Sequence, residues 1–124
     1  MATRNPSDRI RLDLPYPPSI NHYWRRSGRR IHVSTEGIRY REAVCWRVME
    51  EGRPSVAGRL AVEILVHPPD RRRRDIDNVQ KALLDSLEHA HVYEDDAAID
   101  RITVERCGIV AGGKVVVFIE RIGA

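Results

Sequence analysis

The residues with the clearest chemical potential lie together in residues 70–81, which read DRRRRDIDNVQK. The four consecutive arginines can contact several DNA phosphates, and such contacts make the binding affinity depend on salt concentration. Two carboxylates, Asp75 and Asp77, follow with one residue between them. Because side chains two residues apart in extended backbone point the same way, both carboxylates can converge on one divalent cation such as Mg²⁺.

Each of these features also has a purely structural interpretation. The arginine run can be a solvated loop. Asp75 can cap the helix that follows, and Asp77 can complement the dipole of that helix. Lys81 lies four residues after Asp77 on the same helical face. It can form an ion pair with Asp77, or it can stabilise negative charge that develops on a phosphate.

A second acidic cluster favours the catalytic interpretation. Glu94, Asp95 and Asp96 follow the predicted helix, and a third carboxylate from this cluster would complete a metal site beside the arginines. Clustered carboxylates repel one another unless a cation lies between them. Phosphodiester hydrolysis needs arginines that bind phosphates and carboxylates that hold Mg²⁺, which lowers the pKa of a bound water. The pattern therefore predicts a metal-dependent nuclease.

Other candidate residues give weaker evidence for a functional role. His89 and His91 could bind zinc, but no second pair of ligands has a suitable spacing. Cys45 lies on the apolar stripe of a predicted helix, which favours a core position over a nucleophile. Tyr23 and Trp24 precede two arginines, so they either stack on unpaired bases or pack a loop onto the sheet. The sequence contains neither a P-loop nor a dinucleotide-binding fingerprint.

Length and composition indicate one ordinary globular domain. The chain has 124 residues, of which 42% are hydrophobic and 31% charged. No apolar run approaches the roughly 18 residues that cross a bilayer, and the first residues lack the apolar region of a secretion signal. The two cysteines, at positions 45 and 107, fit no disulfide framework. We therefore expect a reduced, cytoplasmic protein with no membrane partner.

Charge is distributed unevenly along the chain. The 21 basic residues include only two lysines, and arginine is well suited to bidentate phosphate contacts. A GC-rich genome would give the same arginine bias. Residues 1–60 carry a net charge of +6, whereas residues 61–124 carry −3. This segregation favours contact with a polyanion beside a cation-attracting carboxylate site, although a mixed, solvated surface is the alternative.

Hydrophobic periodicity predicts the elements that must position these residues. Residues 9–14 alternate as a half-buried strand that ends at prolines. Residues 19–30 have the composition of a mobile or ligand-binding loop, and residues 31–33 of a short strand. A helix follows from an N-cap at Ser34 or Thr35 to residue 51. Its predicted buried stripe comprises Ile38, Val44, Cys45, Val48 and Met49.

The apolar pattern in the second half of the chain predicts a strand, a helix and a hairpin. Residues 60–66 are almost wholly apolar, as in a strand covered on both faces. Residues 76–90 show helical spacing, and residues 99–107 and 114–122 are predicted to pair as a hairpin. The order β-α-β-α-β-β predicts an α+β (α/β-like) fold, with a small mixed sheet of about four strands and two helices. We expect residues 1–8 to be flexible.

Four blocks of the chain resemble the RusA family of Holliday junction resolvases. They are LPYPPSINHYW (residues 14–24), HVSTEGIRYR (32–41), DRRRRDIDNVQKALLDSL (70–87) and VYEDDAAID (92–100). The resemblance covers almost the whole chain and implies a single endonuclease domain over residues 1–124. It implies a homodimer from a phage or prophage that acts in DNA recombination and repair. Such an enzyme nicks two strands of a four-way DNA junction symmetrically, with Mg²⁺ or Mn²⁺ and without a small-molecule cofactor.

The resemblance also assigns roles to individual residues. Its three essential acidic positions, the implied metal ligands, fall on Asp75, Asp77 and Asp96, and its important lysine falls on Lys81. Asp95 matches a further acidic position whose role is less defined. The implied nucleic-acid-binding residues come from the loop after the prolines, the arginine run and the following helix: Ser19, Asn21, His22, Arg71, Arg72, Arg73, Arg74, Asn78 and Lys81.

The sequence departs from the family pattern at two places, the helix exit at residues 89–91 and an added segment over residues 1–8. Neither departure touches the acidic positions. Two alternatives stay open, a nuclease with broader flap or duplex specificity and a phage protein that binds branched DNA without cutting it.

Overall fold

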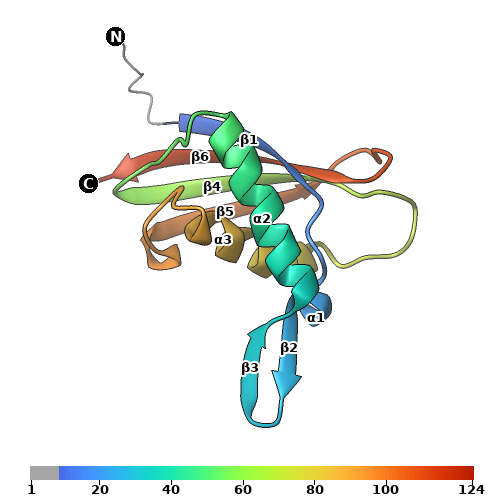
Figure 1. Ribbon diagram of the computed structural model, residues 1–124. Helices are drawn as coiled ribbons and strands as arrows, with labels where there is room; N and C mark the ends of the chain where they lie inside the picture. Colours follow the sequence, from blue (N-terminus) through green and yellow to red (C-terminus); the bar gives the residue numbers. More distant parts are fainter. Residues whose placement is uncertain (1–8) are drawn as a thin grey trace.

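A four-stranded mixed sheet forms the centre of the computed structural model, which describes residues 9–124 (Figure 1). Its strands are β1 (Arg9–Pro15), β4 (Arg59–His67), β5 (Ile99–Arg106) and β6 (Lys114–Gly123), in the spatial order β1-β6-β4-β5. β6 runs antiparallel to both of its neighbours, and β4 and β5 are parallel. The predicted mixed sheet and the order of its main elements are confirmed. The expected flexibility of residues 1–8 lies outside the described residues.

Two helices, α2 (Thr35–Glu50) and α3 (Gln80–His89), pack on the same face of this sheet. Alternate residues of β1, β4 and β6 point toward them, as the period of two in a strand requires. Val62, Ile64 and their partners across the register, Ile119 and Val117, are fully buried there. In the described part of the chain, no helix is long and apolar enough to cross a membrane.

The predicted hairpin between the last two strands is wrong. β5 and β6 do not pair, because β6 inserts between β1 and β4 while β5 lies at the edge. Burial explains the choice: Val115, Val116 and Val117 are buried on both faces of β6, whereas β5 is exposed along most of its length. An apolar strand gains most from a central position, since its neighbours exclude water on both sides.

The stretch expected to be a loop, residues 19–30, contains regular structure. A single turn, α1 (Ile20–Tyr23), leads into a hairpin of β2 (Trp24–Ser27) and β3 (Arg30–Val33). Its two-residue turn begins at Gly28, whose φ is +63°, a conformation that glycine adopts without strain. β3 contains the short strand predicted at residues 31–33, whereas β2, with the sequence WRRS, lacks the apolar alternation from which strands are predicted.

The buried face of α2 differs from the predicted stripe. Gly37, Tyr40, Val44 and Val48 point inward, whereas Ile38 and Met49 are 48% and 45% exposed. Cys45, expected in the core, is only half-buried. The spacing of three, four and four residues is helical, but a glycine and a tyrosine supply half of the stripe. The predicted cap is confirmed, since Ser34 Oγ accepts a hydrogen bond from the Gly37 N–H at 2.9 Å.

The second predicted helix begins as a 3₁₀ turn, η1 (Ile76–Val79), and continues as α3. Its buried residues are Ala82, Leu83, Leu84, Ser86 and Leu87. A second short 3₁₀ turn, η2 (Asp96–Ala98), leads into β5.

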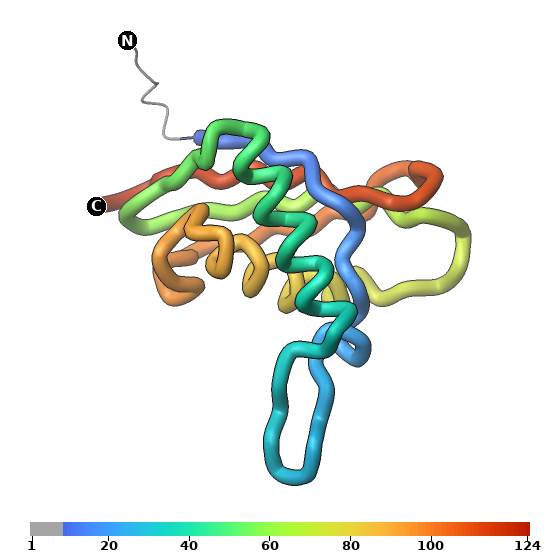
Figure 2. Tube along the Cα trace, viewed as in Figure 1, coloured from blue at the N-terminus to red at the C-terminus, as the bar shows by residue number. Residues whose placement is uncertain are grey.

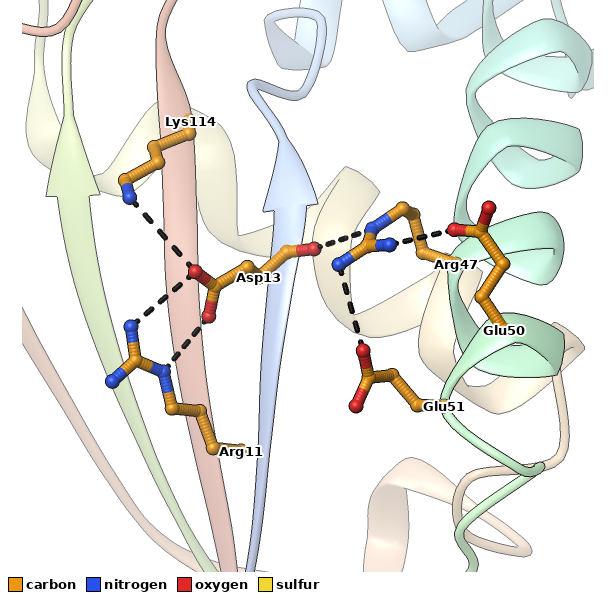
Figure 3. A network of polar contacts seen from close by, with 6 residues as sticks. All are labelled: Arg11, Asp13, Arg47, Glu50, Glu51 and Lys114. Carbon is orange, nitrogen blue, oxygen red and sulfur yellow. Dashed lines mark hydrogen bonds and ion pairs between the residues drawn. The ribbon is translucent and has the colours of Figure 1, made fainter.

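A polar network fastens the end of α2 to the sheet (Figure 3). Arg47 Nε donates to the carbonyl oxygen of Asp13 at 3.0 Å, and the same guanidinium pairs with Glu50. The Asp13 carboxylate accepts from Arg11 at 2.8 Å and faces Lys114 at 3.9 Å. The hydrogen bond from Arg11 lowers the pKa of Asp13. The network joins α2, β1 and β6.

Candidate nucleic-acid-binding and catalytic site

The arginine loop (residues 70–75) follows the carboxyl end of β4 and is held by one of its own ion pairs. Asp70 Oδ1 accepts from Arg74 Nη1 at 2.6 Å and from the Arg72 backbone N–H at 2.9 Å. The hydrogen bond from Arg74 is the main cause that lowers the pKa of Asp70 to about 2. The loop therefore has a defined shape in which Arg74 acts structurally.

Two contacts from outside the loop fix Arg74 further. Arg106, at the end of β5, donates from Nη2 to the Arg74 carbonyl oxygen at 2.6 Å. The Arg74 guanidinium lies 5.9 Å from the centre of the Tyr16 ring, within the range of a cation–π contact. Arg71, Arg72 and Arg73 are exposed and form no ion pair with any residue between 9 and 124. Three of the four arginines are thus available to an anion.

A cavity of about 550 Å³ joins this loop to the chain after β1. It collects many of the residues that the sequence assigned to nucleic-acid binding: Ser19, His22, Arg72, Arg73, Arg74 and Asn78, together with Asp75. Ser19 Oγ and His22 Nδ1 are hydrogen-bonded at 3.1 Å. Arg71 lines a neighbouring cavity of about 340 Å³. The structure therefore places exposed arginines and one carboxylate around a single hollow.

Asp75 is exposed and occupies the N-cap position of η1, but its side chain does not cap the turn. Its backbone is extended, with φ −81° and ψ 135°, and its side chain makes no capping hydrogen bond. The capping interpretation is wrong. Asp77 lies within the 3₁₀ turn itself, so the extended backbone expected through both carboxylates ends at Asp75.

Asp77 and Lys81 are both exposed. Although they are four residues apart, they form no ion pair in the described structure. The interpretation of Lys81 as a partner of Asp77 is therefore not supported, and both charges face solvent. Asn21, another predicted DNA-binding residue, lies on α1 and lines a separate cavity.

Asp96 lies in a different environment, at the far end of α3. Its Oδ1 accepts from the Tyr93 hydroxyl at 2.8 Å, and its backbone N–H donates to Glu88 Oε1 at 3.1 Å. Burial, with the charges of Asp96 and Asp95, raises the pKa of Glu88. These contacts hold Asp96 firmly within a local group of acidic side chains.

One chain does not bring the three predicted metal ligands together. β4 and β5 pair with Leu60 opposite Ile99 and Val66 opposite Arg106. Asp96 lies just before Ile99, whereas Arg106 contacts the arginine loop. The seven residue-to-residue steps from Ile99 to Arg106 span about 23 Å at 3.3 Å per step. Figure 1 shows the arginine loop and the orange turn before β5 at opposite ends of the sheet.

The other side chains that could ligate a metal do not complete a metal site either. Within residues 9–124 no group of three or more histidine, cysteine, aspartate or glutamate side chains could hold a metal ion. His89 and His91 are exposed and acquire no further ligands. The residues of a single chain therefore do not fit the three-carboxylate Mg²⁺ site that the sequence predicted.

The aromatic pair after the prolines is divided between two roles. Tyr23 is fully buried, and its hydroxyl donates to Asp85 and accepts from Arg41 Nε. Base stacking by Tyr23 is thus ruled out. Trp24 is half-buried, with its ring 5.2 Å from that of Tyr23 in an edge-on arrangement.

Sequence reasoning missed two residues that shape the site. Tyr16 lines both cavities of the arginine loop, and Arg106 tethers that loop. Tyr16 lies between two prolines, a position from which a ligand-binding wall could have been suspected. Nothing near Arg106 signals its role, since the contact depends on the parallel pairing of β5 with β4.

Comparisons with known proteins give a consistent result. The family model described as Endodeoxyribonuclease RusA matches residues 15–120. A protein of Enterobacteria phage HK97 named crossover junction endodeoxyribonuclease rusA is 44% identical over 103 residues, 82% of this chain and 85% of that protein. The Escherichia coli K12 protein of the same name is 39% identical, over 90% of this chain and 94% of its own length. A relative from Enterobacteria phage 82 is 38% identical over the same shares.

Proposed function

This chain belongs to the RusA family of crossover junction endodeoxyribonucleases, and from that premise we propose that it resolves four-way DNA junctions by paired, symmetric nicks. The relatives named above come from phages and from Escherichia coli. We infer a phage or prophage origin and a role in recombination and repair of DNA, in the cytoplasm.

The observation that carries the proposal is the hollow beside the arginine loop. Exposed guanidinium groups of Arg72 and Arg73 line it together with the Asp75 carboxylate. Guanidinium groups bind phosphate oxygens in a bidentate manner. A DNA backbone held by these arginines would pass directly over the carboxylate, which is the juxtaposition that phosphodiester hydrolysis needs.

Neighbouring polar groups would complete the phosphate-binding surface. Ser19, His22 and Asn78 line the same hollow and offer hydrogen-bond donors to phosphate oxygens. Lys81 is exposed one helical turn beyond Asp77, where its ammonium group can stabilise charge that develops on a phosphate. Asn21 and Arg71 would contact the DNA on either side of this centre.

The separation of the acidic residues supports a homodimer. Asp75 and Asp77 lie at one end of α3 and Asp96 at the other, so one chain does not assemble the three-carboxylate site. A two-fold axis can bring Asp96 of one copy to Asp75 and Asp77 of another, and it then forms two equivalent sites. We therefore propose that Mg²⁺, which Mn²⁺ could replace, is held between two copies. A symmetric junction offers two equivalent phosphodiesters to such a pair.

Cleavage of a synthetic four-way junction tests this function. The full chain is incubated with junction and with linear duplex of the same sequence, with Mg²⁺, with Mn²⁺ and with a chelator. The proposal expects paired nicks at symmetric positions that require the cation and spare the duplex. Equal cutting of both substrates would support the alternative of broader specificity. Tight junction binding without cutting at any cation concentration would support a non-cleaving binding protein.

A further inference from the structure

The β2–β3 hairpin projects from the body of the molecule away from the sheet (Figures 1 and 2). Its residues pair from Trp24 opposite Val33 to Ser27 opposite Arg30. Most of its side chains are exposed. An isolated two-stranded hairpin is marginally stable at best in water. The question is therefore which contacts hold this hairpin and what it binds.

The base of the hairpin is held rigidly. The Ser34 N–H donates to the Tyr23 carbonyl oxygen at 2.9 Å, and Ser34 Oγ donates to the carbonyl oxygen of His22. The buried Tyr23 hydroxyl contacts Asp85 of α3 and Arg41 of α2. These bonds fix the direction in which the hairpin points. They also connect it to His22, which lines the hollow beside the arginine loop.

The hairpin carries only positive charge. No aspartate or glutamate occurs between positions 14 and 35, a segment with four arginines and two histidines. Arg25, Arg26, Arg29 and Arg30 are all exposed, and none forms an ion pair within the described residues. Elsewhere arginines such as Arg47 do pair with carboxylates. Four unneutralised guanidinium groups on one projection repel one another unless an anion approaches.

The strand register divides the hairpin into two faces. Arg25, Ser27, Arg30 and His32 share one face, and the face is wholly polar. Trp24, Arg26, Ile31 and Val33 share the other, because side chains alternate along a strand.

The second face combines apolar and cationic groups. The Ile31 side chain is 60% exposed, more than any other large aliphatic side chain between positions 9 and 124. It borders a cavity of about 600 Å³ with Asn21, Trp24, Arg25 and Arg26. An exposed isoleucine surrounded by arginines is complementary to a ligand that carries both negative charges and apolar faces.

We propose that the β2–β3 hairpin is a second DNA-contacting arm, separate from the arginine loop. Its polar face, with Arg25 and Arg30, binds backbone phosphates, and Ile31 with Trp24 contacts unpaired or unstacked bases. DNA offers both chemistries: charged phosphates, and base faces that accept apolar wedges and aromatic rings. The inference rests on the proposed function only in taking DNA as the polyanion.

The phosphate-binding half of the proposal is tested with full-chain variants. Fluorescence anisotropy measures binding of labelled junction and labelled duplex at several salt concentrations. For the Arg25→Ala/Arg30→Ala double variant we expect the slope of log K against log salt to fall by about two, one for each lost phosphate contact. At fixed salt the Kd should rise on the order of tenfold for both DNAs.

Arg101→Ala is the matched control, since Arg101 is an equally exposed strand arginine that lies on β5, away from the hairpin. It should leave the salt slope close to that of the unaltered chain. If the double variant keeps the same slope and Kd as the control, the arm does not bind phosphates and the proposal is overturned.

The base-contacting half is tested with Ile31→Ser. A junction that carries 2-aminopurine beside its branch point reports unstacking through a rise in fluorescence. We expect the unaltered chain to produce that rise, Ile31→Ser to lose most of it, and the junction Kd to increase at least about fivefold. The duplex Kd should stay unchanged. An unchanged fluorescence response in Ile31→Ser would overturn this half.

The outcomes separate this proposal from the proposed function. If the unaltered chain cuts junctions but the arm variants bind DNA as it does, only the arm is refuted. If the unaltered chain never cuts but the arm variants lose affinity, the arm stands and the catalytic function fails. Circular dichroism of each variant is the check that the exposed substitutions leave the fold intact.

Discussion

The Nη2 atom of Arg106 donates a hydrogen bond to the carbonyl oxygen of Arg74 at 2.6 Å, joining the end of β5 to the arginine loop. The loop is otherwise held by the pair of Asp70 with Arg74 and by the contact of Arg74 with Tyr16. One edge strand thus supports the loop that offers arginines to an anion. The contact exists because β5 runs parallel to β4 and ends beside its carboxyl end.

We expect Arg106→Gln to loosen the arginine loop without unfolding the protein. Loss of one exposed hydrogen bond costs about 1 kcal/mol, but the loop loses its tether to β5. Amide hydrogen exchange should quicken in residues 70–75. Arg101→Gln, the same substitution at an exposed site on the same strand, should leave that exchange unchanged. Equal exchange in the two variants would contradict the tethering role.

Asp77→Asn should separate binding from catalysis. Asp77 is exposed within η1, and its side chain has no hydrogen-bonded partner in the described chain, so the substitution should not disturb folding. Junction cleavage should fall by on the order of 100-fold or more, while junction binding is retained or strengthened because a negative charge near phosphate is removed.

Arg72→Ala should have the opposite effect on DNA binding from Asp77→Asn. It should weaken junction binding and lower the salt slope by about one. Nicking and anisotropy assays on the same junction distinguish the two effects. Joint loss of binding and cleavage in a folded Asp77→Asn protein would count against a catalytic role.

Mixing two inactive variants tests whether the acidic site is shared between copies. Asp75→Asn and Asp96→Asn homodimers should each be inactive. If the site combines Asp75 of one copy with Asp96 of another, a mixed dimer contains one doubly altered site and one intact site. The mixture should then nick one strand of a junction. If each chain builds its own site, every site in the mixture is damaged and no nicking appears.

Most elements of the fold could be predicted because their hydrophobic periods are local. Residues 9–14, 60–66 and 76–90 contain their strand or helix signal within a few turns. Strand order is not local. The partners of β5 and β6 depend on how much apolar surface each strand buries, and the short glycine turn at residues 112–113 wrongly favoured a hairpin.

The candidate site shows the same division. The arginines and Asp75 are neighbours in sequence, so their placement on one loop could be predicted from composition. The place of Asp96 could not, because it depends on the length of α3 and on the register of Ile99 with Leu60. Most of the β2–β3 arm was missed for a different reason. Only residues 31–33 were predicted as a strand, because the arginines and the glycine of residues 25–30 have the composition of a loop.

The pair of Asp70 with Arg74 predicts a specific titration. The pKa of Asp70 is lowered to about 2 from its ordinary value of 3.8, chiefly by the hydrogen bond from Arg74. A depressed folded-state pKa favours the loop conformation above pH 3.8, and this support is lost as pH falls toward 2. Carbon-13 NMR of the carboxyl group should show Asp70 titrating near 2.

Arg74→Ala should raise that value toward 3.8, but not fully, because the Arg72 N–H still donates to Asp70. Arg73→Ala removes a neighbouring cation that makes no contact with this carboxylate in the described structure, and it should have little effect. A pKa of Asp70 that does not move in Arg74→Ala would refute the pairing.

Gly37→Ala tests the fixed base of the arm. A Cβ at Gly37 would lie 2.6 Å from the Tyr23 carbonyl oxygen and 2.6 Å from Val33 Cγ1. Alanine favours a helix over glycine by about 1 kcal/mol, but overpacking of this kind costs about 1–3 kcal/mol. Since the carbonyl belongs to the backbone and cannot rotate away, the steric cost should prevail. Urea denaturation should therefore show a lower free energy of unfolding.

Gly108→Ala is the control, because a Cβ there meets no atom within 4 Å and should leave stability nearly unchanged. The two neighbours of Gly37 belong to the base of the hairpin, so the strain should also appear as faster amide exchange in residues 24–33. DNA affinity should fall with it if the arm must be held in one direction to bind. Unchanged stability and exchange in Gly37→Ala would mean that the base yields easily, and a rigidly directed arm could not then be maintained.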